Sequence, residues 1–281
     1  MKNSKIAGVV VLYNPPEDFE NNIKTYIDDL DVLYVIDNSN NKNKLFKNDK
    51  IVYIFNNENI GVAKALNIGA AKAIEKKYNW LLTMDQDTKF NKGVMKRMTN
   101  YIKNNDTKDD GILVPWHNTK LDIVKSEDPI DYPLQVMTSG NLVNLEIYKK
   151  IGEYNEDYFI DGIDIEYCLR IKKNNYRIVR FNDVSIEHDL GDIEYHKFLG
   201  KTYLCSNHNY LRNYYIARNY RYIRKKYYDI APEYCEILTH LKLRIFRIVM
   251  FEKDKYRKVR NIIRGIKDFK KGVIGKYPYK N

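Results

Sequence analysis

The first third of the chain alternates short apolar runs with segments of helical periodicity. Residues 17–30 and 61–77 repeat apolar side chains every three or four positions, which is typical of helices packed on one face. The runs between them are short, rich in β-branched residues and bounded by turn residues, so each predicts a buried strand: Ile6–Tyr13, Val32–Ile36, Ile51–Phe55 and Trp80–Met84. Buried strands separated by helices predict an α/β fold with a mostly parallel central sheet.

The middle of the chain is less regular. Helices are expected at Met95–Lys103, Leu145–Ile151 and Asp164–Lys173, and strands at Ile112–Pro115, Gln135–Thr138, Tyr176–Phe181 and Val184–His188. From about Leu199 onward Tyr, Arg and Lys dominate, no strand alternation remains, and 234–251 has helical periodicity. We therefore predict a catalytic domain over residues 1–200 and a basic, Tyr-rich helical region over residues 201–281.

The charge distribution supports this division. The chain has a net charge of +11, yet residues 205–281 hold 20 basic against 6 acidic side chains, so the preceding part is mildly acidic. A basic tail favours anionic partners such as membrane lipid, a phosphorylated substrate or nucleic acid. No apolar run reaches the ~20 residues that cross a bilayer, and the first run is better explained as a strand than as a signal peptide. Three widely spaced cysteines without a CxxC pair indicate a reducing compartment.

Two carboxylates follow the fourth predicted strand. Asp85 and Asp87 come directly after the apolar run in the order Met84-Asp85-Gln86-Asp87-Thr88. Ligands bind beyond the carboxyl ends of strands in parallel sheets, and hard oxygen ligands suit Mg²⁺ or Mn²⁺. The simpler alternative is a surface turn in which an Asp caps the next helix.

A second group of acids, Asp161, Asp164 and Glu166, leads into a predicted helix. A carboxylate at a helix N-terminus is kept ionised by the helix dipole, as a general base must be. The alternative is an ordinary acidic first turn. Asp37 also follows a buried strand, and His188 ends one; each is equally explained as a turn or structural residue.

The ordered set of these segments resembles family 2 glycosyltransferases, and among them bacterial rhamnosyltransferase-like enzymes. The resemblance covers roughly residues 5–192 and extends to Leu211–Asn219 in the tail. The matching pieces are Val9–Pro15, Ile36–Ser39, Asn59–Gly69, Leu82–Thr88, Thr138–Asn141, Phe159–Arg170 and His188–Gly191. The resemblance implies a GT-A nucleotide-diphospho-sugar transferase fold and an inverting, metal-dependent sugar transfer.

The resemblance also implies roles for individual residues. Asp85 and Asp87 correspond to the DxD motif of the family: Asp87 would hold Mn²⁺ or Mg²⁺, and Asp85 the ribose or the metal. His188 would lie near the diphosphate or the metal. Asp164 matches the second acid of the Glu-Asp base motif, but Ile163 stands where that motif often has Glu, which leaves Asp161 and Glu166 as alternative bases. The remaining expected nucleotide-sugar contacts are Leu12, Tyr13, Asn14, Asp37, Lys64 and Gly140.

The function implied is transfer of a sugar to a glycan or polyprenyl-diphosphate-linked acceptor in bacterial surface polysaccharide synthesis. L-Rhamnose from dTDP-rhamnose is favoured as donor, with UDP-hexose or UDP-N-acetylhexosamine as the alternative. We expect a cytoplasmic enzyme bound to the inner face of the plasma membrane through anionic lipid, with no nucleic-acid partner, and self-association stays open. A sugar nucleotidyltransferase is disfavoured because Tyr13-Asn14-Pro15-Pro16 replaces its glycine-rich loop. A non-enzymatic nucleic-acid- or membrane-binding protein remains the non-catalytic alternative.

Overall fold

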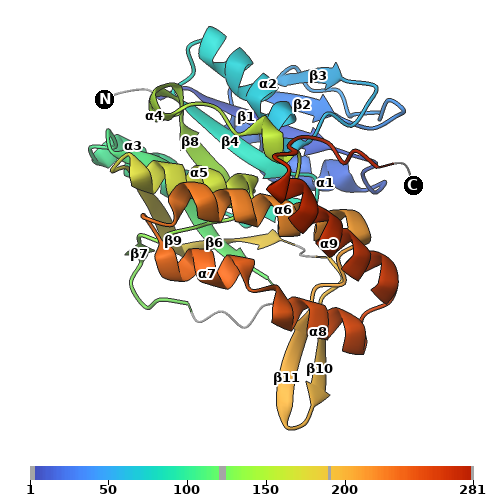
Figure 1. Cartoon of the computed structure of the whole chain (residues 1–281). Coiled ribbons are helices and arrows are strands. Elements are labelled where there is room, and N and C mark those ends of the chain that lie inside the picture. Colours follow the sequence, from blue (N-terminus) through green and yellow to red (C-terminus); the bar gives the residue numbers. More distant parts are fainter. Residues whose placement is uncertain (1–3, 120–124, 189–190, 280–281) are drawn as a thin grey trace.

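The computed structural model describes residues 4–119, 125–188 and 191–279. Its centre is a nine-stranded sheet whose first half is parallel, in the order β3-β2-β1-β4 (Figure 1). These strands are β1 (Ile6–Leu12), β2 (Val32–Asp37), β3 (Ile51–Phe55) and β4 (Trp80–Asp85). Every residue of β1 is buried, because strands on both sides and helices on both faces cover it. The predicted fold class and parallel strands are confirmed.

The second half of the sheet is mixed. It continues from β4 in the order β8-β6-β9-β5, and β7 pairs with β9. The strands are β5 (Thr88–Phe90), β6 (Asp110–Asn118), β7 (Ile130–Asp131), β8 (Asn141–Asn144) and β9 (Arg177–His188). Only the pairing of β6 with β9 is parallel here; β8 runs antiparallel to both neighbours, and β5 and β7 run antiparallel to β9.

Helices cover both faces and divide the apolar side chains into two cores. One core lies beneath α2 (Val62–Glu75), α4 (Leu145–Ile151), α5 (Ile163–Lys173) and the C-terminal helix α6 (Tyr210–Tyr227). The other lies beneath α1 (Phe19–Ile23), a 3₁₀ turn (Ile27–Asp29) and α3 (Val94–Asn104). Close packing of α2 requires Gly69, because a Cβ there would lie 2.4 Å from Val9 Cγ2.

Four predicted elements differ from the structure. The segment Gln135–Thr138 is not a strand, because carbonyls of this segment accept hydrogen bonds from the side chains of Thr83 and Asn141 instead of a neighbouring strand. The strand at this place is β8, which follows it. Tyr176–Phe181 and Val184–His188 belong to one strand, β9, interrupted by a bulge opposite Pro115. The helix expected over residues 17–30 is broken into α1 and the 3₁₀ turn.

The C-terminal region begins with a hairpin that the sequence pattern did not reveal. Strands β10 (Glu194–Phe198) and β11 (Lys201–Cys205) are joined through Leu199 and Gly200, both with positive φ. A Leu-Gly turn lacks the Asn-Gly signal of such hairpins. In addition, β10 buries none of its residues fully, so the strand has no alternation of buried and exposed side chains that the sequence could reveal. The prediction that no strand follows Leu199 is therefore wrong. Figure 1 shows the hairpin projecting beyond α8 (Leu241–Phe251).

Four helices complete this region: α6, α7 (Pro232–Thr239), α8 and α9 (Lys255–Lys270). α6 lies beside α5, α7 and α9 pack on α6, and α8 contacts α9 and the hairpin (Figure 1). The helical periodicity of residues 234–251 is divided between α7 and α8 at His240. Within the described ranges, no helix has the length and apolar character needed to cross a bilayer.

Candidate active site

Polar side chains collect where the parallel strands end. Asp37 ends β2 and Asp85 ends β4, and both strands flank β1. In register, Asp37 lies opposite Leu12 and Asp85 opposite Val11. The carboxyl edge of the sheet thus brings together residues that lie far apart in the sequence, as expected for a ligand site in an open α/β sheet.

Asp85, Asp87 and His188 form a candidate metal centre. One ligand atom from each residue lies within 4.8 Å of the others. Antiparallel pairing of β5 with β9 places Thr88 opposite His188 and so brings the histidine beside Asp87, with Nδ1 3.7 Å from Oδ1. Two carboxylates and one imidazole form a donor set that suits a divalent cation.

A chain of hydrogen bonds through neighbouring side chains holds this cluster in place. Ser139 Oγ accepts from the Asp85 backbone N–H at 2.9 Å and donates to Thr88 Oγ1 at 2.8 Å. Thr88 Oγ1 lies 2.7 Å from His188 Nδ1. A proton on Nδ1 pointing at Thr88 leaves Nε2 with the lone pair that metal ligation needs. Gly140 does not line the cleft; it makes the turn beneath it, with φ +81° and its N–H bonded to Thr83 O at 2.8 Å.

Asp85 is buried close to a second carboxylate, although His188 and Arg212 partly offset the effect of these surroundings on its pKa. Burial, followed by the negative charge of Asp87, raises the pKa of Asp85 to about 6. A carboxylate held beside another carboxylate in this way is stabilised when a cation binds. The residues therefore fit a divalent metal ion.

The three acids before and within α5 have different surroundings. Asp161 is ion-paired with Arg212 at 2.6 Å. Glu166 is fully buried and bonded to Arg170 at 2.6 Å, Lys226 at 3.0 Å and the Tyr227 hydroxyl at 2.5 Å. Both acids already have strong structural partners, so neither is well placed to accept a substrate proton.

Asp164 differs from these two acids. Among the described residues no ion pair is recorded for it, and its Oδ1 accepts a hydrogen bond from the Ile165 backbone N–H at 2.9 Å. Burial raises its pKa to about 6, although the Ile165 bond lowers it, and the charge of Asp161 raises it further. Such a pKa suits a base working near neutral pH, because the carboxylate is ionised and still accepts a proton readily.

The loop before α5 is held in an unusual conformation by α6. Phe159 and Asp161 have φ values of +62° and +61°, a region that non-glycine residues rarely adopt. The buried Asn219 amide donates to the backbone carbonyls of Tyr158, Ile160 and Asp161 at 2.9, 2.9 and 2.8 Å. The segment 211–219, included in the resemblance without a role, thus fixes the loop that presents Asp164.

The cleft between these groups has a volume of about 600 Å³. Asp85, Asp87 and His188 line one part of it, and Asp161, Gly162 and Asp164 line another. Sequence reasoning missed Arg212 and His208, which also line it; the basic segment 211–219 was the available signal for Arg212. Asp189 and Leu190, which belong to a matching motif, lie outside the described residues.

The predicted nucleotide contacts are only partly in this cleft. Asp85 lines it, whereas Tyr13 is exposed outside its lining, and the Tyr13 N–H donates to Gln86 Oε1 at 2.9 Å. Asn14, with φ +44°, donates its N–H to Ser39 Oγ at 2.8 Å. Leu12 is buried, so only its backbone is suited to a ligand, and Lys64 is exposed on α2 outside the cleft lining.

Asp37 is fully buried in this structure. Its carboxylate accepts from Ser39 N at 2.9 Å, Asn43 Nδ2 at 2.8 Å and the Tyr53 hydroxyl at 2.5 Å. Burial raises its pKa, but these hydrogen bonds outweigh burial and lower the pKa below 3.8. Asp37 thus remains ionised and holds the loop after β2, and contact with a nucleobase requires this loop to shift.

Sequence comparisons identify the family. Residues 9–125 match the family model Glycosyl transferase family 2. The dTDP-rhamnosyl transferase RfbF of Shigella flexneri is 28% identical over 210 residues, which are 68% of this chain and 71% of that protein. Residues 9–125 are therefore assigned to glycosyl transferase family 2, and both similarities support a glycosyltransferase. The predicted rhamnosyltransferase-like family and enzyme class are confirmed.

Solved glycosyltransferase structures share the GT-A fold of this glycosyltransferase. Residues 1–349 of S. aureus TarS, in complex with UDP-GlcNAc, superpose with a TM-score of 0.57 and 14% identity, covering 96% of this chain and 81% of that one. GalNAc-T7 with UDP, GalNAc and Mn²⁺ gives a TM-score of 0.59 and 12% identity, covering 97% of this chain. This glycosyltransferase spans only 57% of the GalNAc-T7 chain.

Proposed function

We propose that the chain transfers L-rhamnose from dTDP-rhamnose, with inversion, to a glycan or lipid-linked glycan of a bacterial surface polysaccharide. The observation that carries the proposal is a single cleft lined both by the acidic cluster Asp85, Asp87 and His188 and by Asp164, which forms no ion pair among the described residues. The choice of sugar and nucleotide rests on the similarity to a dTDP-rhamnosyl transferase.

In this proposal Asp87 and His188 hold the metal, and Asp85 binds the metal or the ribose. A bound Mn²⁺ or Mg²⁺ would offset the charge that develops on the departing diphosphate. The backbone from Leu12 to Asn14 lies at the strand ends, where a nucleoside is expected to bind. The buried Ser139 and Thr88 keep the acidic cluster in place.

Asp164 acts as the general base. The acceptor oxygen attacks the anomeric carbon as the bond from that carbon to the diphosphate oxygen breaks, and the hydroxyl proton passes to Asp164. The nucleoside diphosphate leaves from the opposite face of the sugar, so one displacement inverts the configuration. Asp161 keeps Arg212 beside the cleft and does not itself take the proton, since the two are ion-paired at 2.6 Å.

The test is a donor panel. Purified protein with Mn²⁺ is given dTDP-rhamnose, UDP-glucose or UDP-N-acetylglucosamine, and release of nucleoside diphosphate is measured with and without acceptor extracts. Release from dTDP-rhamnose alone, lost in Asp87→Ala, is the expected result. Preference for a UDP-sugar would overturn the proposed donor and support the alternative. No release from any donor, together with no nucleotide binding, would favour a non-catalytic binding protein.

The proposed location is the cytoplasmic face of the plasma membrane. Two observations support it: the basic C-terminal region, and apolar side chains on α7 and α8 that are exposed, such as Ile237, Leu243 and Val249. Apolar side chains next to Lys and Arg are typical of surfaces that bind anionic lipid. Other apolar residues of this region are used internally: Phe246 and Phe251 pack on Tyr203 of the hairpin.

A further inference from the structure

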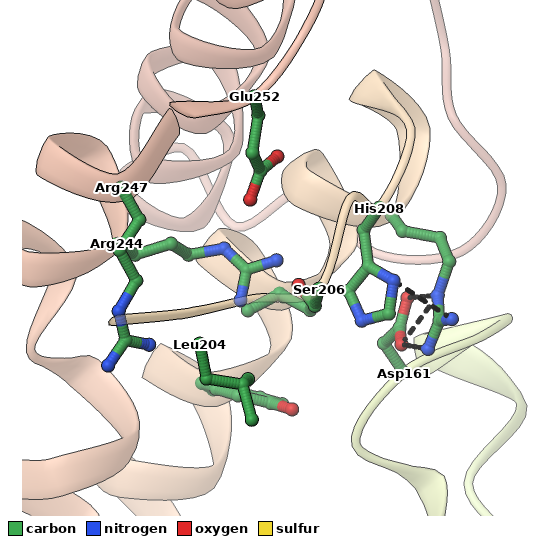
Figure 2. Close-up of a pocket in the computed structure, with 10 residues that line it drawn as sticks. Asp161, Leu204, Ser206, His208, Arg244, Arg247 and Glu252 are labelled. Atoms are coloured by element: carbon green, nitrogen blue, oxygen red, sulfur yellow. Dashed lines mark hydrogen bonds and ion pairs between the residues drawn. The ribbon is translucent and has the colours of Figure 1, made fainter. Parts of the chain in front are cut away.

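A second cavity adjoins the cleft and is rich in arginine. It has a volume of about 210 Å³ and is lined by Arg212, Arg244 and Arg247 together with the acids Asp161 and Glu252. Figure 2 shows Arg244 and Arg247 on one side of this cavity, Asp161 and His208 on the other, and Glu252 at the top between them. Asp161, Arg212 and His208 also line the cleft, so the two spaces are adjacent.

Among the described residues, two of the arginines have no acidic ion-pair partner. Asp161 is paired with Arg212, and Glu252 is paired with Lys258 at 2.7 Å. In the part of the chain that the structure describes, no ion pair is recorded for Arg244 or Arg247. Arg244 Nε donates to Asn213 Oδ1 at 2.9 Å, a neutral acceptor. Arg247 Nε is buried and lacks a hydrogen-bond partner among the described residues.

The positive charges of Arg244 and Arg247 lower the stability of the fold unless an anion binds beside them. Burying a positive charge without a partner destabilises a fold. Burial accordingly lowers the pKa of Arg244, in spite of opposing contributions from Tyr220, Asp161 and Glu252. An anion bound between Arg244 and Arg247 would satisfy both guanidinium groups, and arginine binds phosphate through paired hydrogen bonds.

On its other side the arginine cavity adjoins an apolar one. This third cavity, of about 340 Å³, is lined by Ile237, Leu238, Leu241 and Leu243 and again by Arg244 and Arg247. The cleft and the apolar cavity have no lining residue in common, whereas the arginine cavity shares residues with each. The order in space is therefore catalytic cleft, arginines, apolar groove.

We propose that the arginine cavity binds the phosphate or diphosphate of the acceptor, with the acceptor sugar at Asp164 and its apolar chain in the groove between α7 and α8. This order matches a sugar joined through phosphate to a lipid. A water molecule takes up roughly 30 Å³ of liquid. The arginine cavity, at about 210 Å³, is several times larger and so has room for a phosphate group. The inference rests on the proposed function, because it names the acceptor class for the same active site.

The test measures binding of farnesyl diphosphate and of inorganic pyrophosphate to the full chain, without metal and without donor. Farnesyl diphosphate should bind more tightly than pyrophosphate, because only farnesyl diphosphate reaches the apolar groove. Arg247→Gln should weaken binding of both by about 10-fold or more, the range for a hydrogen bond to a charged group. Lys242→Gln is the matched control, since Lys242 is exposed on the same helix and outside both cavities.

Each contrary result has a separate meaning. Equal losses in Arg247→Gln and Lys242→Gln would indicate general charge attraction and overturn the site. Equal affinity for pyrophosphate and farnesyl diphosphate would show that the apolar groove does not bind the lipid chain. The arginine cavity would then be a site for free phosphate. The proposed donor chemistry is followed separately, by Mn²⁺-dependent binding of dTDP, which Arg247→Gln should leave unchanged. Loss of dTDP binding in Arg247→Gln would assign the cavity to the donor and overturn the inference.

Discussion

Replacing Asp164 by Asn tests the proposed base with little change in shape. The amide keeps the hydrogen bond from Ile165 but cannot take a proton. Loss of a general base lowers turnover by about 10²- to 10⁴-fold, which is about 3–5 kcal/mol of transition-state stabilisation. Binding of the nucleoside diphosphate should stay close to that of the wild type, because Asp164 lies on the acceptor side of the cleft in our proposal.

The pH dependence follows from the pKa of about 6 that burial gives Asp164. The base works only when ionised, so wild-type turnover should rise through about pH 6 and level off above about pH 7. The profile is measured at saturating Mn²⁺, since metal binding displaces the proton from Asp85, whose pKa is also about 6. The Asn variant should lack this rise.

The same substitution should stabilise the fold above pH 6. The unfolded chain releases the Asp164 proton near pH 3.8, whereas the folded chain keeps it to about pH 6. Wild-type stability therefore falls as pH rises across this range, and the loss is complete above it. At ~1.4 kcal/mol for each pKa unit the loss is about 3 kcal/mol. Because Asp164 is only partly buried, solvent screening reduces it to about 1–2 kcal/mol.

The assay combines kinetics with urea unfolding of metal-free protein at pH 4 and pH 7.5. The expected variant is nearly inactive, equally stable at pH 4 and more stable at pH 7.5. An Asn variant that keeps turnover while Asp161→Asn loses it would show that the base is Asp161. An inactive variant that is less stable at both pH values would show a structural role instead.

Three further substitutions test the account around the site. Asn219→Ala removes the donor to three buried or partly buried carbonyls and should cost about 2–4 kcal/mol of unfolding free energy. Asn105→Ala at the exposed end of α3 should cost under about 1 kcal/mol, and equal costs in urea unfolding would refute the loop-holding role. Glu166→Gln leaves Arg170 without its buried partner and should destabilise by about 3 kcal/mol, with turnover per folded molecule largely kept; a stable but inactive variant would make Glu166 the base. Wild-type protein should sediment with anionic vesicles at low salt and Leu243→Glu much less; binding unaffected by salt and by this change would place any membrane site elsewhere.

Much of the fold was predictable because parallel strands carry a local signal. The four strands β1 to β4 are short, apolar and bounded by turn residues, so their ends and the polar groups there could be located from the sequence. Asp85 and Asp87 were found for this reason. The position of His188 beside the acidic cluster could not be derived from local sequence. It depends on the pairing of β5 with β9, which joins residues 100 positions apart.

The C-terminal region was less predictable. Its helices were recognised by composition, but their contacts with the catalytic loop depend on tertiary packing. Asn219 and Arg218 are fully buried, and Arg218 donates to Asp157 O at 3.1 Å. Deleting residues 205–281 would therefore remove supports of the active site, and point substitutions are the better test of membrane binding. The division into domains of 1–200 and 201–281 stays a prediction.

The central claim is that Asp85, Asp87 and His188 bind the metal through which the nucleotide is held. The direct measurement is calorimetric titration of dTDP into wild type and Asp87→Ala, with and without Mn²⁺. We predict that Mn²⁺ tightens binding to the wild type by about 10-fold or more, as ~1.4 kcal/mol corresponds to each factor of ten, and leaves Asp87→Ala unchanged. The exposed Asp109 provides the control, and Asp109→Ala should behave as wild type. Equal Mn²⁺ dependence in wild type and Asp87→Ala, or none in the wild type, would contradict the claim.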